Sequence, residues 1–136
     1  MTRAALGEAQ VHAARRSVLL RRLTALGVLV SAVVHLFLYF DGFNTIDVIG
    51  PLFLLNGIGG LFLGVAVLMW RHPIWLLAAA GFCASTLGAF LLSATVGLLG
   101  VHEPFFGYTQ TTAFLAELIG LISALAALAT WRRRRA

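Results

Sequence analysis

Charged side chains are scarce in this 136-residue chain: only 11% of its residues are Asp, Glu, Lys or Arg, and lysine is absent. A soluble domain carries about 25% charged residues, so the composition excludes a globular fold with a hydrated surface. The hydrophobic residues, 60% of the chain, come in long runs, each near the ~20 residues that cross a hydrocarbon core. The sequence therefore predicts an all-α protein, a transmembrane bundle of four helices in one domain.

Cysteine is almost absent as well. The one cysteine, Cys83, lies inside an apolar run, which excludes an intrachain disulfide, a cysteine-based metal site and a CxxC redox pair. The chain also has no phosphate loop and no nucleophile motif. Its Gly-rich stretch 56–64 lies inside an expected span, whereas a dinucleotide fingerprint needs a strand before it and a helix after it. These absences favour a protein that is not an enzyme.

The apolar runs define the domain organisation. The basic segment 1–22 is expected to form either an interfacial helix at the cytoplasmic surface or an irregular tail. The first apolar run is longer than the 7–15 residues of a signal-peptide core, so we interpret it as a retained span. The transmembrane domain covers 23–131, a basic tail covers 132–136, and the four expected spans are 23–40, 49–70, 74–99 and 111–131.

The basic residues are all arginines, and their placement predicts the orientation. Segment 1–22 holds five, the turn 71–73 holds one, the tail holds four, and the loops 41–48 and 100–110 hold none. By the positive-inside rule, both termini face the cytoplasm of a bacterium, and the protein lies in the cytoplasmic membrane. Because the arginines flank the spans, we expect lipid rather than nucleic acid as their partner. The candidates for lipid-phosphate contacts are Arg15, Arg16, Arg21, Arg22, Arg132 and Arg133.

Each expected span carries one polar side chain at a similar depth. At ~1.5 Å per residue, His35, Asn56, Ser93 and Glu117 lie roughly 8–10 Å from the outer ends of their spans. Ionisable groups at such depth are costly, are usually paired, and often mark function. With Tyr39, these residues are candidates for a ligand site or a proton relay. The alternative is a set of polar contacts that only fixes helix register.

Small residues recur every three or four positions beside these polar groups. This spacing is typical of membrane helices that pack closely, and it predicts that the polar groups point into the bundle. The candidate packing positions are Gly60, Gly64, Gly81, Ser85, Ala89 and Gly120.

His35 and Glu117 are natural partners for an ionic or hydrogen-bonded pair. A metal site is a weaker alternative, because zinc usually takes three or four protein ligands. Such a site would need His102 and Glu103, from the loop 100–110, to complete the set. The sequence identifies no cofactor.

One stretch resembles a known channel family. Asn56-Gly-Ile-Gly-Gly-Leu-Phe-Leu-Gly64 resembles the second helix of small bacterial fluoride channels. The stretch from Gly81 to Phe90, Gly-Phe-Cys-Ala-Ser-Thr-Leu-Gly-Ala-Phe, departs from the Phe-rich motif that this family carries in its third helix.

A broader resemblance covers most of the chain. It combines His35 and Tyr39, Ile49-Gly-Pro-Leu-Phe-Leu-Leu-Asn56, Val96-Gly-Leu-Leu with Glu103, and Glu117. This pattern resembles small four-helix membrane proteins of high-GC Gram-positive bacteria, and it implies no particular activity. In architecture alone the chain is similar to DoxX-type proteins, which are associated with quinone-linked redox chemistry.

Three functions follow as hypotheses. The first is a non-catalytic subunit or accessory protein of a larger membrane assembly, packed against a partner protein or a second copy of itself. The second is a small transporter or channel in which His35 and Glu117 relay a proton or an ion. The third is a redox membrane protein that binds a quinone, a metal or another ligand at the level of His35, Asn56, Ser93 and Glu117, here called the polar layer.

Overall fold

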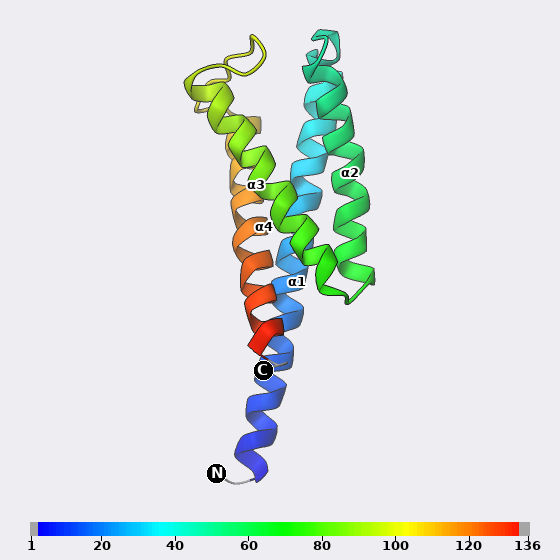
Figure 1. The fold of residues 1–136 in the computed structure, drawn as a ribbon, viewed down its shortest axis with the longest axis vertical. Coiled ribbons are helices and arrows are strands. Elements are labelled where there is room, and N and C mark those ends of the chain that lie inside the picture. Colours follow the sequence, from blue (N-terminus) through cyan, green and yellow to red (C-terminus); the bar gives the residue numbers. More distant parts are fainter. Residues whose placement is uncertain (1–2, 134–136) are drawn as a thin grey trace.

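The computed structural model describes residues 3–133, which form four long helices and one short 3-10 helix (Figure 1). Helix α1 covers Arg3–Phe40, η1 Phe43–Thr45, α2 Ile49–Met69, α3 Pro73–Thr95 and α4 Tyr108–Arg133. All four α-helices are long and apolar enough to cross a membrane. The predicted fold class, an all-α bundle of four membrane-spanning helices, is confirmed.

Helix α1 is much longer than its expected span. It has 38 residues, about 57 Å at 1.5 Å per residue, and its first turns extend beyond the bundle along the same axis (Figure 1). Residues 3–22 are thus helical, but they continue the span instead of forming a separate interfacial helix. The reason is local. Most residues of this stretch are Ala, Arg, Leu, Gln or Glu, which are good helix formers, and the stretch contains no proline.

The ends of α3 differ from the expected span 74–99. At its start, the backbone N–H of Ile74 donates to His72 Nδ1 at 3.2 Å, and Pro73 occupies the first turn, where its missing N–H costs nothing. At its end the helix stops at Thr95, because Gly97 and Gly100 have φ values of +86° and +84°. Glycine adopts this left-handed conformation without steric cost, so the chain turns away from the helix axis.

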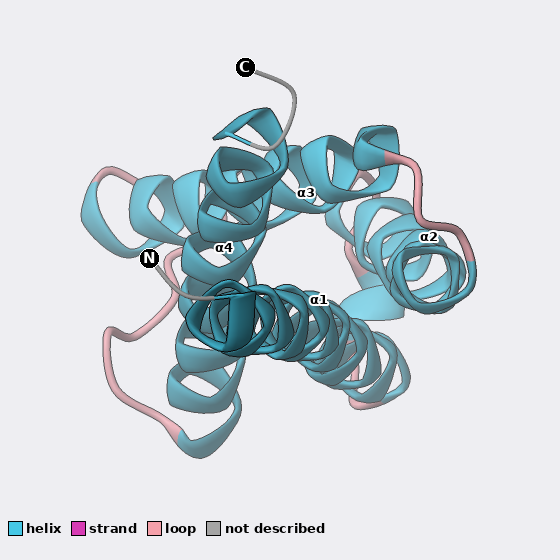
Figure 2. Cartoon of the chain, turned by 90° about the horizontal axis from the view of Figure 1, so that it is seen from below, coloured by secondary structure: helices cyan, strands magenta, loops and turns pink. Residues whose placement is uncertain are grey.

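Helix α1 packs along both α2 and α4, and α3 packs on α4. Helices α2 and α3 follow each other through a tight turn but then diverge and share little surface (Figures 1 and 2). Both termini and the turn 70–72 lie at one end of the bundle, here called the terminal end. The segments 41–48 and 96–107 lie at the other, the loop end (Figure 1). Leucine, valine and phenylalanine side chains cover much of the outer surface, as contact with a lipid bilayer requires.

The half of the bundle nearer the termini is closed by small residues. A Cβ added to Gly120 would lie 2.8 Å from Cys83 Sγ, and one added to Gly27 would lie 2.8 Å from the Gly120 Cα atom. On α2, a Cβ at Gly60 would lie 2.8 Å from Ala32 Cβ, and one at Gly64 would run into Leu29. Glycine is therefore required where α1 meets α2 and where α4 meets α1 and α3.

Two of the candidate packing positions on α3 lie on its exposed side. Gly81 and Ser85 are exposed, and no neighbouring atom lies within 4 Å of the place where a Gly81 Cβ would be. Helix α3 instead buries Ala79, Cys83 and Leu87, a row about 200° away around the helix at 100° per residue. Small size alone did not show which side of α3 faces the bundle, because alanine, cysteine and glycine are small on both sides. Ala89 is half-buried and lines the cavity described below.

Candidate functional site

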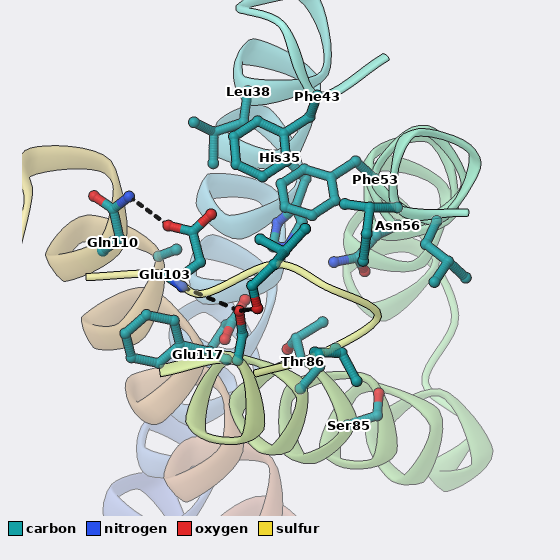
Figure 3. A pocket seen from close by; sticks show the side chains of 18 of the residues that line it. His35, Leu38, Phe43, Phe53, Asn56, Ser85, Thr86, Glu103, Gln110 and Glu117 are labelled. Atoms are coloured by element: carbon teal, nitrogen blue, oxygen red, sulfur yellow. Dashed lines mark hydrogen bonds between the residues drawn. The ribbon is translucent and has the colours of Figure 1, made fainter. Parts of the chain in front are cut away.

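A cavity of about 520 Å³ lies among the four helices in the half nearer the loop end (Figure 3). Its lining includes His35 of α1, Asn56 of α2, Ser93 of α3 and Glu117 of α4. The structure thus brings together the four polar side chains that the sequence placed at one depth, and it adds Thr86, Glu103, Thr109 and Gln110 to the same lining. A volume of this size falls in the range of small-molecule sites, roughly 300–1,000 Å³.

Glu117 is 2% exposed and is held by a neighbouring helix. Ser31 Oγ of α1 donates to its Oε1 atom at 2.6 Å, and the Thr86 hydroxyl of α3 also interacts with the carboxyl group. The predicted direct pair with His35 is absent from the described hydrogen bonds, because Ser31 takes that place. The carboxyl group of Glu117 therefore joins α4 to α1 and α3 through two short hydroxyl side chains.

His35 is fixed by its own helix and by an aromatic stack. Its Nδ1 atom donates to the Ser31 carbonyl oxygen at 2.8 Å, and its ring lies 5.0 Å from the ring of Phe53, which stacks on Phe43 at 4.6 Å. With the proton on Nδ1, a neutral imidazole presents Nε2 as an acceptor.

Asn56 points from α2 toward the cavity (Figure 3). Its side-chain amide is half-buried, and no hydrogen bond joins it to any other part of residues 3–133 that the structure describes. The two donors and the acceptor of Asn56 are thus available to a molecule inside the cavity.

Ser93 has a different role from the one expected. Its hydroxyl donates to the Val101 carbonyl oxygen at 3.0 Å and accepts from the Glu103 backbone N–H at 3.2 Å. Gln110 Nε2 then donates to Glu103 Oε2 at 2.8 Å (Figure 3). These bonds fold the segment 96–107 over the cavity and place the Glu103 carboxylate in its wall.

Gln110 was not singled out from the sequence, although a signal existed. Gln110 and Glu117 are seven residues apart, which puts them on one face of a helix. The apolar part of the lining was missed too: Phe43, Phe53, Phe82, Phe90 and Phe114. Phenylalanine is ordinary in a membrane span, so nothing in the sequence marked these five.

Tyr39 is not brought into the layer. It does not line the cavity, and its ring packs edge-on against Phe40 with ring centroids 5.1 Å apart. Of the candidates for a ligand site or a proton relay, Tyr39 therefore lies outside the cavity lining.

The structure does not bring together all four residues considered for a metal site, His35, His102, Glu103 and Glu117. His102 is exposed, does not line the cavity, and lies against Gly97, where an added Cβ would be 2.5 Å from its Nε2 atom. Over the described residues, no three His, Cys, Asp or Glu side chains are placed to hold a metal ion. The His102 ring thus packs against the turn at Gly97, outside the cavity lining.

Arg21 forms hydrogen bonds with the backbone of α2 and the turn after it. Its guanidinium donates to the carbonyl oxygens of Val67, Trp70 and Arg71 at 2.8, 2.6 and 3.0 Å. These are carbonyl groups at and just after the C-terminal end of α2, which have no partner within the helix. Arg21 thus caps α2, while Arg15, Arg16, Arg22, Arg132 and Arg133 are exposed.

The cavity opens sideways between α2 and α3. Three of its lining residues, Leu52 and Leu55 of α2 and Ser85 of α3, are themselves exposed. This is the side on which the two helices diverge (Figure 1).

The cavity does not continue toward the terminal end. Below it lies a packed core that includes Val28, Val67, Leu76 and Cys83. The hydroxyls of Thr24 and Ser123 bond to carbonyl groups of their own helices, Leu20 and Ile119. The polar layer is therefore the blind end of a pocket that opens toward lipid and the loop end.

Comparison of the chain with families of proteins, with curated proteins and with solved structures finds no match.

Proposed function

We propose that this protein is a binding protein for a small lipid-soluble molecule that carries a polar head group. The observation that carries this proposal is the cavity between α2 and α3, with a free Asn56 amide at a wall that is otherwise largely apolar. The polar head would lie among His35, Asn56 and Glu117, and the apolar part would lie along the phenylalanine rings toward the opening. Sites of this kind combine an apolar lining with a few polar groups that fix orientation.

The geometry favours binding over a proton or ion relay. A relay needs a path through the whole membrane, and the side chains of the core below Glu117, such as Val28, Val67 and Leu76, are packed and apolar. In the terminal half, the buried hydroxyls of Thr24 and Ser123 are already bonded to their own helices. The polar layer suits a molecule that enters and leaves on the same side.

The orientation belongs to the same proposal. The termini and the turn at Arg71 lie at one end of the bundle (Figure 1), and the arginines of the chain lie in those segments. By the positive-inside rule this end faces the cytoplasm of a bacterial cell. The cavity then opens into the outer leaflet of the cytoplasmic membrane.

A pair of glycines provides the test. Gly59 lines the cavity and Gly81 does not, yet a Cβ at either position would have no neighbouring atom within 4 Å. Gly59→Leu should fill the cavity, and Gly81→Leu should add the same side chain to the lipid-facing surface. Each protein is purified from bacterial membranes in mild detergent, and native mass spectrometry measures the bound small molecules.

We expect a non-covalent adduct in the unchanged protein and in Gly81→Leu, at near one per chain, and at least a tenfold lower occupancy in Gly59→Leu. An adduct retained in full by Gly59→Leu would place binding elsewhere and overturn the proposal, as would the lack of any adduct in all three proteins. A stoichiometric protein partner that occupies the opening instead would favour the accessory-subunit hypothesis.

A further inference from the structure

We propose that the molecule bound in this cavity is a hydrophobic cation, such as an amphiphilic amine or a quaternary ammonium compound; this inference rests on the proposed binding function. The observation behind it is the balance of charge in the lining. Glu103 and Glu117 face the same cavity, and among residues 3–133 neither arginine nor lysine lines it. The one lining side chain that can become positive is His35.

The hydrogen bonds of the two carboxyl groups leave room for a cation. Glu117 accepts from Ser31, and Glu103 accepts from Gln110, and both donors are neutral. Within the described residues, no arginine, lysine or histidine forms a salt bridge to either group. A carboxylate in such a place gains more from a positive head group than from a neutral one, because a counter-charge offsets the cost of its burial.

The aromatic rings support the same class of ligand. Phe53 and Phe43 stack beside His35 on one wall, while Phe90 and Phe114 pack with ring centroids 6.0 Å apart on the opposite helices. The faces of aromatic rings attract cations, and cages of such rings bind quaternary ammonium groups. Rings of phenylalanine also accept the apolar part of an amphiphile, so the lining fits both parts of the molecule.

The charge distribution of the whole chain points the same way. The acidic residues Asp41, Asp47 and Glu103 lie in the segments of the loop end, and the arginines lie in the segments of the terminal end. A surface of one sign around the mouth of a site raises the local concentration of ligands of the opposite sign. Cations are therefore favoured at the end of the bundle where the cavity lies.

The experiment uses two probes of the same shape and opposite charge, tetraphenylphosphonium and tetraphenylborate. Saturable binding is measured in lipid nanodiscs that contain the full chain, with empty nanodiscs subtracted to remove partition into lipid. We expect saturable binding of the phosphonium cation and none of the borate anion. Glu117→Gln and Glu103→Gln should each raise the Kd for the cation by at least tenfold, whereas Glu8→Gln, at an exposed position on the extension of α1, should leave it unchanged.

The outcomes separate this inference from the proposed function. If the anion binds as tightly as the cation, or if both Gln variants bind the cation like the unchanged protein, the charge assignment is wrong, even when the native adduct is still lost in Gly59→Leu. If no adduct and no saturable probe binding are found, the binding function itself fails. Thermal unfolding of each Gln variant accompanies the titration, and Glu103→Gln keeps the test valid if Glu117→Gln does not fold.

Discussion

The two halves of the bundle are built from the same kinds of small and apolar residues, but one half is tightly packed and the other encloses a cavity. In the terminal half, glycines stand where helices touch, and an added Cβ at Gly27 or Gly120 would meet backbone atoms or the Cys83 sulfur atom. In the loop half, a cavity of about 520 Å³ separates the helices, and Gly59, on the face of α2 that lines it, has open space where a Cβ would be. The difference comes from α3, which stays close to α4 but leaves α2 after the turn at residues 70–72 (Figure 1).

This difference shows how a four-helix membrane protein can be both stable and hollow. Without a hydrophobic force between helices in lipid, close packing and buried hydrogen bonds hold a bundle together. The terminal half supplies the packing, and Arg21 caps α2 at the same level. The loop half can then afford polar groups that are not fully paired, such as the Asn56 amide, because the helix positions are set elsewhere.

The largest loss of stability is expected when a glycine in the terminal half is enlarged. Gly120→Val should destabilise the fold by about 3 kcal/mol, since overpacking a tight core typically costs 1–3 kcal/mol and backbone atoms cannot move aside easily. Reversible unfolding in mixed micelles by increasing sodium dodecyl sulfate fraction measures the change. Gly81→Val is the control, because its Cβ meets nothing within 4 Å, and it should change the free energy by less than about 0.5 kcal/mol. Equal losses for the two variants would mean that the outer face of α3 is packed as tightly as the core.

A smaller loss is expected when the cap of α2 is removed. Arg21→Ala deletes three charge-assisted hydrogen bonds to carbonyl oxygens, and bonds of this kind contribute roughly 1.5–3 kcal/mol, so we expect about 2 kcal/mol. Arg22→Ala, at the exposed neighbouring position, is the matched control and should cost little. The same unfolding assay compares them. A similar loss from both would return Arg21 to the role that the sequence predicted, a contact with lipid phosphates.

The hydrogen bonds of Arg21 illustrate what the sequence could and could not predict. Long apolar runs predicted the four spans, because a bilayer demands length and hydropathy whatever the tertiary contacts are. Arginine beside a span predicted a membrane boundary, but the partner of Arg21 depends on where α2 ends in space. In the same way, the left-handed turn at Gly97 shortened α3, and no hydropathy pattern encodes that.

The candidate site was predictable in its polar members and not in its shape. One polar residue per span at one depth was visible for His35, Asn56 and Glu117, because helix rise converts sequence position into depth. The cavity depends on the divergence of α2 and α3, and the tilt of a helix is set by its neighbours, not by its own composition. The Ser31 hydroxyl came between Glu117 and His35 for a related reason, since side-chain partners are chosen at distances finer than one helical turn.

The smallest effect is expected in the loop that covers the open half. Ser93→Ala removes the acceptor of the Glu103 backbone N–H and the donor to the Val101 carbonyl oxygen. Hydrogen exchange of the Glu103 amide should rise about fivefold, corresponding to the ~1 kcal/mol that a typical hydrogen bond contributes, while global stability changes little. Ser85→Ala is the control on the same helix, because that hydroxyl bonds only to the Phe82 carbonyl oxygen of its own turn. An unchanged exchange rate of the Glu103 amide in Ser93→Ala would contradict this prediction. It would mean that the bond between Gln110 and Glu103, and not Ser93, holds the loop over the cavity.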